Sequence, residues 1–392
     1  MDSEESAAGR LVRHDFDNLF PLPYRICFEI LLGIWGWGLN TQILKAVHID
    51  LGYMLRYQTG RTLHESVYFF ALGLTIFYVF SILAYWVQLR GYEALGDTSV
   101  PLQGLDLLPW ATFLGFVAVF LYPGPSFHHN GRRRFQAVLK RVSVGGLDLE
   151  NRLSDILLAD VITSYSKVLV DIAIMACTLL SGKSCLGLPD RLCGGQMLVP
   201  LISLIPFGIR FRQCLIDYGR TGQRLHLFNA LKYASSAPVI LLSALQRKYS
   251  NSESSAIDKG YIQDLWVLAV LVNSTYSFIW DIGFDWDLHM LKSGSSFRHG
   301  GLRPVIYFGS KYWYYLAVVV DYLLRFTWSL KLSSHWYHLA DYESGIFILE
   351  ILEIVRRWLW IFFRLESEWV KNIKDSMPKS NALPLTELSR DD

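Results

Sequence analysis

The feature that most constrains this chain is a series of long apolar stretches with few or no charged residues. Four of them contain no Asp, Glu, Lys or Arg: Val67–Leu89, Leu107–Tyr122, Leu265–Trp280 and Met197–Ile209, the last of which runs into Arg210. Five more are mostly apolar but contain isolated or clustered charges: Tyr24–Val47, Val161–Leu180, Leu225–Leu245, Tyr312–Leu330 and Gly345–Phe363. A membrane-spanning helix needs about 20 mostly apolar residues. We therefore expect an all-α polytopic membrane protein with about eight to ten transmembrane helices.

Composition argues against a soluble alternative. Only 18% of the 392 residues are charged and 52% are apolar, whereas a soluble domain carries roughly 25% charge. A soluble chain would have to bury this many apolar helices inside one core. The formal net charge of +2 gives no polyelectrolyte character, so nucleic acid is not an expected partner.

Polar segments divide the chain into three regions: a short cytosolic N-terminus (1–20), a transmembrane domain (21–370) and a polar tail (371–392). The first apolar stretch is too long for a signal peptide, so we interpret it as an uncleaved anchor. The connector Gly131–Arg152 places Arg132, Arg133, Arg134, Lys140 and Arg141 on an amphipathic pattern. This pattern is typical of a helix on the cytosolic face of a membrane.

The cysteines suggest a disulfide rather than a metal site. Cys27, Cys177 and Cys214 lie in apolar sequence and are most simply core residues. Cys185 and Cys193 share a Gly-rich loop, where they could form a disulfide if the loop faces an oxidising lumen. No CxxC with paired histidines is present, so we expect no metal and no cofactor.

Charged residues inside apolar stretches are the informative ones. Inserting each into the centre of a membrane helix costs about 2.5–3.5 kcal/mol, unless the side chain forms an ion pair or lines a water-filled cavity. Asp281 and Asp285 are four residues apart and would share a helix face; a water-facing helix end is an equal alternative. Arg325 lies deep in its stretch and needs a carboxylate, an anion or water. Glu353, Arg356 and Arg357 have helical spacing, and a self-neutralised pair would also explain them.

Two further groups complete the set. Lys232 precedes Tyr233 in an amphipathic stretch, and Asp160, Thr163 and Ser166 recur at about one helical turn. Arginine binds phosphate oxygens in a fork, and lysine acts as a mobile charge. The accompanying carboxylates would neutralise the cations in an empty site, and they can accept a hydrogen bond from hydrogenphosphate, which sulfate cannot donate. Such a site should prefer phosphate to sulfate.

These residues lie in motifs that resemble the EXS-domain family. The blocks are long and in the family's order: Pro206–Leu215, Asn229–Tyr233, Tyr276–Trp286, Asp321–Trp328 and Glu353–Glu366. The resemblance implies an all-helical phosphate transporter of the xenotropic-retrovirus-receptor type. Many members carry an N-terminal SPX domain, for which we expect no room before the first span. The sequence is therefore most similar to the SPX-less, fungal ER-retention-defective branch.

That branch implies a multi-pass protein of the Golgi membrane, cycling with the ER. Its members return phosphate released by luminal glycosylation to the cytosol and support retention of glycosyltransferases. Matching the motifs residue by residue implies a phosphate site made of Asp160, Thr163, Ser166, Lys232, Tyr233, Asp281, Asp285, Arg325, Trp328, Glu353, Arg356 and Arg357. Thr163 stands where the exporter pattern has Asn, but it can still donate one hydrogen bond.

Three hypotheses of different class remain. The leading one is a phosphate channel or carrier, with inorganic phosphate and membrane lipids as partners. The alternative is a cargo-retention factor without transport activity, whose tail and Arg132–Arg134 run bind Golgi glycosyltransferases and coat adaptors. The third is an enzyme acting on lipid phosphates, which we disfavour because no nucleophile or metal motif is visible. Transport direction and oligomeric state stay open, a homodimer being one alternative.

Overall fold

The structure is a computed structural model that describes residues 16–56, 63–95, 104–126, 128–144, 150–250, 256–291, 300–327 and 343–376. Every regular element in these ranges is a helix. The elements are α2 (Leu22–Ala46), α3 (Leu51–Met54), α4 (Leu63–Leu95), α5 (Leu107–Leu121), α6 (His129–Ser143), α7 (Arg152–Ser164), α8 (Ser166–Leu180), α9 (Leu198–Thr221), α10 (Arg224–Ala234), α11 (Ser236–Ser250), α12 (Ala256–Trp280), the π-helical turn η2 (Asp281–Asp285), the 3₁₀ turn η3 (His289–Leu291), α13 (Lys311–Arg325) and α15 (Glu343–Ser376).

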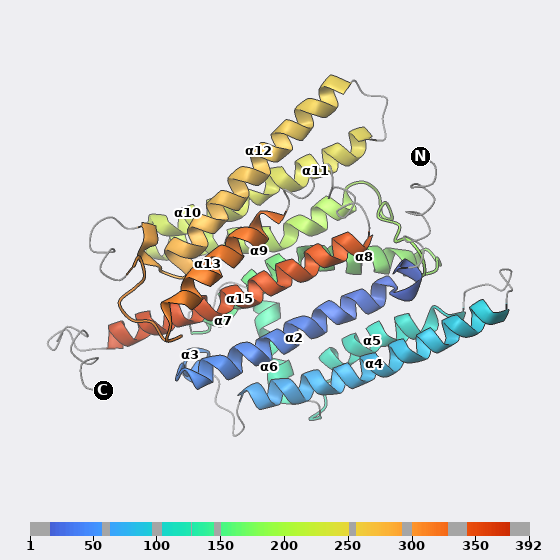
Figure 1. Cartoon of the computed structure of the whole chain (residues 1–392), viewed down its shortest axis with the longest axis horizontal. Helices are drawn as coiled ribbons and strands as arrows, with labels where there is room; N and C mark the ends of the chain where they lie inside the picture. The colour runs from blue at the N-terminus through green and yellow to red at the C-terminus, as the bar shows by residue number, and fades with distance from the viewer. Residues whose placement is uncertain are drawn as a thin grey trace.

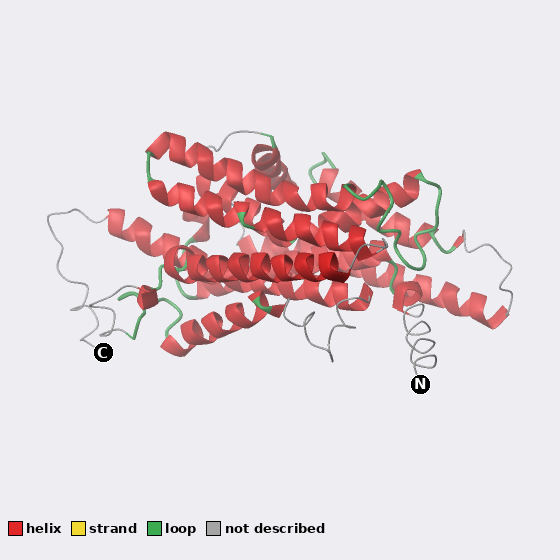
Figure 2. Ribbon diagram, turned by 90° about the horizontal axis from the view of Figure 1, so that it is seen from above, coloured by secondary structure: helices red, strands yellow, loops and turns green. Residues whose placement is uncertain are grey.

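The long helices form a bundle around α15. Most run along the long axis of the molecule (Figure 1), and the view from above shows the same elongation (Figure 2). Helix α15 packs against α2, α7, α13 and η2, whereas α2 also packs against α4, α5 and α8. Helices α9 to α12 form the other side of the bundle through α9–α10 and α11–α12 contacts. This arrangement leaves α15 in the interior, with partners on several sides.

The expectation of an all-helical membrane protein is confirmed. Three described helical segments are long and apolar enough to cross a membrane: Leu63–Gly91, Leu198–Thr221 and Gly260–Asp285. Leu107–Leu121 is apolar but shorter. Some predicted spans are divided into two short helices, since α7 ends at Ser164 before α8, and α10 ends at Ala234 before α11. The count of eight to ten spans stays a prediction.

Helix α2 approaches its neighbours closely through glycines. A Cβ at Gly33 would collide with the Tyr165 hydroxyl, which donates a 2.9 Å hydrogen bond to the Glu29 carbonyl. A Cβ at Gly38 would lie 2.5 Å from Tyr68 of α4. Small residues at helix contacts allow such close approach inside a membrane, where packing drives association. The two glycines thus fix α2 between the α7–α8 break and α4.

The basic connector forms the expected helix, α6, but part of its charge is used internally. Arg132 is buried and donates to the carbonyls of Val119 (3.0 Å), Gly124 (3.1 Å) and Ser126 (2.6 Å), as well as to Tyr122. It therefore satisfies carbonyl groups at and beyond the C-terminal end of α5. The Arg132–Arg134 run is consequently not a wholly exposed basic patch, although Arg133 itself is exposed.

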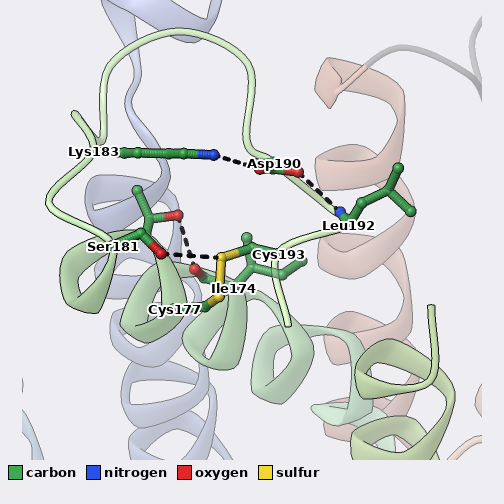
Figure 3. Close-up of a disulfide and its surroundings, with 8 residues drawn as sticks. Ile174, Cys177, Ser181, Lys183, Asp190, Leu192 and Cys193 are labelled. Atoms are coloured by element: carbon green, nitrogen blue, oxygen red, sulfur yellow. Dashed lines mark hydrogen bonds and ion pairs between the residues drawn. A yellow bond between two sulfur atoms is a disulfide. The ribbon is translucent and has the colours of Figure 1, made fainter. Parts of the chain in front are cut away.

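The disulfide predicted between Cys185 and Cys193 is wrong. Cys193 is bonded to Cys177 in the last turn of α8, with the two Cα atoms 6.0 Å apart (Figure 3). Cys185 turns instead toward α5 and lies 3.3 Å from Asp106 Oδ1. The correction also concerns Cys177, whose apolar neighbours suggested a core residue. The loop bends back on the end of α8, which sequence proximity among loop cysteines cannot show.

The same loop is held by polar contacts. Lys183 Nζ lies 3.0 Å from Asp190 Oδ2, and the Leu192 N–H donates to Asp190 Oδ1 at 3.1 Å (Figure 3). The Lys183 contact, reinforced by that N–H, lowers the pKa of Asp190 below its ordinary value. Next to Asp190, Arg191 reaches into the bundle toward α8 and α15.

Candidate anion-binding site

Three helix interruptions each place buried polar side chains in the candidate site. Asp160, Thr163 and Ser164 precede the break between α7 and α8 at Tyr165. Lys232 and Tyr233 precede the break between α10 and α11, and Asp281–Asp285 is itself a π-helical turn. Interrupted helices and π-helical turns are frequent at functional sites in membranes, where freed backbone groups line a polar space.

The first part of the site is an ion-pair cluster between η2, α13 and α15. Arg325 pairs with Asp281 and, at 3.2 Å, with Asp321. Arg356 Nη1 lies 3.3 Å from Asp321 Oδ1 and 3.7 Å from Asp281 Oδ2. Both aspartates are buried, with side chains 1% or less exposed. Each carboxylate is therefore shared between two guanidinium groups, which offsets part of the cost of its burial.

The second part joins α15 to α7. Arg356 holds Glu353 with two hydrogen bonds of 2.9 Å and 2.6 Å. Ser164 Oγ donates to Glu353 Oε1 at 2.7 Å and accepts from Arg357 Nε at 2.9 Å. Arg357 also donates to Thr163 Oγ1 at 3.2 Å. One hydroxyl thus links the carboxylate of Glu353 to a second arginine.

Arg357 differs from the other buried arginines of the site. Its guanidinium group lies over the Trp360 ring at 4.6 Å, and the residue is 8% exposed. Its hydrogen-bond partners are neutral hydroxyls, and among the described residues no carboxylate lies within 4.0 Å of it. A buried guanidinium without a carboxylate is costly. Arg357 is therefore the group best prepared to receive an anion.

The third part contains the remaining cations. Asp160 accepts from Arg210 Nε at 2.7 Å and from the Tyr233 hydroxyl. Lys232 Nζ lies 3.5 Å from Asp285 Oδ2 and 4.6 Å from the centre of the Tyr233 ring. Asp160 also interacts electrostatically with Arg357 and Lys232. The three parts consequently share one electrostatic environment.

One carboxylate of this buried network is partly exposed. The Glu353 side chain is 37% exposed, whereas its partner Arg356 is 4% exposed. Among the described residues, no group of three or more His, Cys, Asp or Glu is arranged to hold a metal ion. The chemistry offered by the site is that of guanidinium, ammonium, hydroxyl and carboxyl groups, which together can bind a protonated oxyanion by exchanging hydrogen bonds.

Most residues singled out from the sequence either form the contacts of this network or make ion pairs next to it. They are Asp160, Thr163, Lys232, Tyr233, Asp281, Asp285, Arg325, Glu353, Arg356 and Arg357. Trp328 lies outside the described residues. Ser166 begins α8 beyond the break, and Ser164 makes the contacts with Glu353 and Arg357 instead.

Sequence reasoning missed four participants: Ser164, Arg210, Asp321 and Arg364. Arg364 Nε lies 3.9 Å from Asp285 Oδ1, which connects a further turn of α15 to the site. Asp321 is four residues before Arg325, so i,i+4 pairing was the available signal. Ser164 is four residues after Asp160, and Arg210 occupies a mostly apolar helix that contains Pro206. For these residues, either helical spacing from a predicted site residue or a charge within an apolar stretch could have indicated a place in the site.

Fold and site together define a helical membrane protein with a buried ion-pair network between interrupted helices. Residues 20–370 match the model of the EXS family, and the chain belongs to that family. It is 32% identical over 282 residues to Protein ERD1 homolog 2 of Schizosaccharomyces pombe, covering 70% of each chain. It is 25% identical to Protein ERD1 homolog 1 of the same yeast, covering 91% of this chain and 93% of the relative.

A second group of relatives is longer than this chain. The xenotropic and polytropic retrovirus receptor 1 homolog of Xenopus laevis is 28% identical over 371 residues, which cover 91% of this chain and 51% of the relative. The recognition of EXS motifs, and of an ERD1-like chain related to the retrovirus-receptor group, is therefore confirmed.

Proposed function

We propose that this protein is an inorganic phosphate transporter or channel of the Golgi membrane that returns luminal phosphate to the cytosol. The observation that carries the proposal is Arg357, a buried guanidinium group held by two hydroxyls and no described carboxylate. Relatives named as solute carrier family 53 members agree with a transport role. The Golgi assignment and the support of glycosyltransferase retention rest on the ERD1-like resemblance.

The geometry suggests how phosphate would be selected. An anion entering beside Arg357 and Lys232 would gain two cations whose existing partners are weak or neutral. Glu353 and Asp160 lie within the same network and can accept a hydrogen bond from hydrogenphosphate. Sulfate has no proton at neutral pH, so it would leave these carboxylates facing an anion without a hydrogen bond. We expect the site to favour phosphate.

Flux measurements on purified protein in liposomes test the proposal. Radiolabelled phosphate should enter wild-type vesicles much faster than sulfate. Arg357→Gln should lower phosphate flux by roughly 10- to 100-fold, because it removes charge-assisted hydrogen bonds of about 1.5–3 kcal/mol. Arg357→Lys should restore little, since an ammonium group cannot reproduce the fork of donors.

The matched control is Arg141→Gln, which removes a guanidinium group from a partly exposed pair with Asp155, outside the site. It should leave flux near the wild-type value. Equal rates for phosphate and sulfate, or an Arg357→Gln protein as active as wild type, would contradict the assigned site.

A retention factor without transport activity is the second candidate, and we propose no enzymatic activity. Arg133 and Lys140 are exposed basic residues on α6 that a coat adaptor could contact. If the wild-type protein carries no phosphate while Arg133→Glu with Lys140→Glu mislocalises glycosyltransferases in cells, the retention role is favoured.

A further inference from the structure

A line of ionisable residues follows one face of α15 from its N-terminal end through the anion site. These residues are Glu343, Glu350, Glu353, Arg357, Arg364 and Glu368. Successive members are three, four or seven residues apart, and this helical spacing keeps them on one face. Helix α15 runs through the middle of the bundle (Figure 1). On this face, Glu350 is the next ionisable side chain on the N-terminal side of Glu353 and Arg357.

Glu350 meets a second carboxyl group there. Glu29 of α2 and Glu350 are 1% and 4% exposed, and their carboxyl groups interact where α2 packs against α15. Oε1 of each is buried without a hydrogen-bond partner among the described residues. Two ionised carboxylates cannot satisfy one another, since neither has a proton to donate. One shared proton gives the pair a hydrogen bond and removes one of two like charges.

The surrounding groups do not neutralise this pair. The charged or titratable groups that act on it come from α2, the α7–α8 break, α8 and the α8–α9 loop: Arg25, Tyr165, Lys167, Asp171 and Arg191. On α15 itself, Glu343 and Glu353 lie on the same face as Glu350. Arg25 is engaged by Asp17 and by Glu343 at 3.2 Å. Arg191 is engaged by Glu343 at 2.7 Å and Asp171 at 3.0 Å, and Lys167 is exposed.

We propose that Glu29 and Glu350 form a buried proton-binding site whose proton controls anion passage along α15. With the proton bound, the pair carries one negative charge and the anion can pass. Without it, the pair carries two and repels the anion. The transport consequence rests on the proposed function, whereas the proton site itself does not. Removing one unit charge at about 10 Å changes a rate on the order of tenfold in an effective dielectric near 20.

Phosphate flux into liposomes at equal internal and external pH, measured from pH 6 to pH 9, tests the control of passage. Wild-type flux should fall as the pair releases its proton. Glu350→Gln fixes one negative charge and supplies an amide donor, so its flux at pH 9 should exceed the wild-type value by about tenfold. Glu29→Gln should behave in the same way. Glu65→Gln, an exposed carboxyl on α4, should keep the wild-type profile.

Infrared spectroscopy of the detergent-solubilised protein tests the proton site without transport. The wild-type protein should show a protonated carboxylic acid band that disappears over the pH range in which flux falls, and Glu350→Gln should lack that band. An inactive wild-type protein that shows the band would refute the proposed function alone. An unchanged band and pH profile in Glu350→Gln would overturn the proton site. If phosphate flux depends on sodium and this dependence is lost in Glu350→Gln, the two carboxyl groups bind a cation, and the proton site is overturned.

Discussion

Ser164 illustrates at the scale of a single residue how the site is held together. Its hydroxyl donates to Glu353 and accepts from Arg357, so it joins a paired carboxylate to an arginine without a described ion pair. The sequence shows which charges lie in apolar stretches, and hence which residues must find partners. It does not show the partners, because a buried charge selects them through contacts between distant helices.

Ser164→Ala should therefore reduce stability more than a typical surface substitution. The change leaves a donor on Arg357 and an acceptor on Glu353 without their shared partner, at a cost of about 1–3 kcal/mol. We expect a lower thermal unfolding midpoint in detergent. Ser203→Ala is the matched control, because that hydroxyl donates to the Val199 carbonyl of its own helix at 2.9 Å. Equal midpoints for the two variants would contradict the linking role of Ser164.

At the scale of the element, helix interruptions decide which side chains reach the site. In a regular helix, Asp160, Thr163 and Ser166 would lie on one face, as the sequence led us to expect. The break at Tyr165 gives that role to Ser164 instead. The position of the break depends on packing against α2, where Gly33 makes room for the Tyr165 hydroxyl.

Gly33→Ala should consequently disturb the α2 contact with the break. The added Cβ collides with the Tyr165 hydroxyl, and overpacking of this kind costs about 1–3 kcal/mol. Combining it with Tyr165→Phe removes the colliding oxygen and should recover part of the loss, as a double-mutant cycle of thermal midpoints can measure. Gly73→Ala on α4, where a Cβ meets nothing within 4 Å, is the control. Additive losses in the cycle would exclude the proposed collision.

At the scale of the whole molecule, α5 separates two ends of the bundle. Asp106, just before α5, contacts Ser184 and Cys185 of the disulfide loop. The opposite end of α5 is capped by Arg132 of α6. Its 15 residues span roughly 22 Å. We therefore expect the loop and α6 to lie toward opposite sides of the membrane.

Labelling with a membrane-impermeant thiol reagent in sealed vesicles tests this sidedness. Leu188→Cys and Arg133→Cys introduce thiols at exposed positions in the loop and in α6. They should react from opposite sides. The natural free cysteines, Cys27, Cys185 and Cys214, are all buried and should give little background. Permeabilised vesicles should label both variants, and labelling of both from one side would refute the arrangement.

The sequence by itself determined the helical membrane class, the family and most of the buried charged residues, because apolar length and intramembrane charge are local properties. The tertiary structure decided the partners. It paired Cys193 with Cys177, placed Arg210 and Asp321 in the network and brought Glu29 of α2 against Glu350 of α15. These outcomes depend on which helices pack together and where they break, and such contacts join residues that are far apart in the chain.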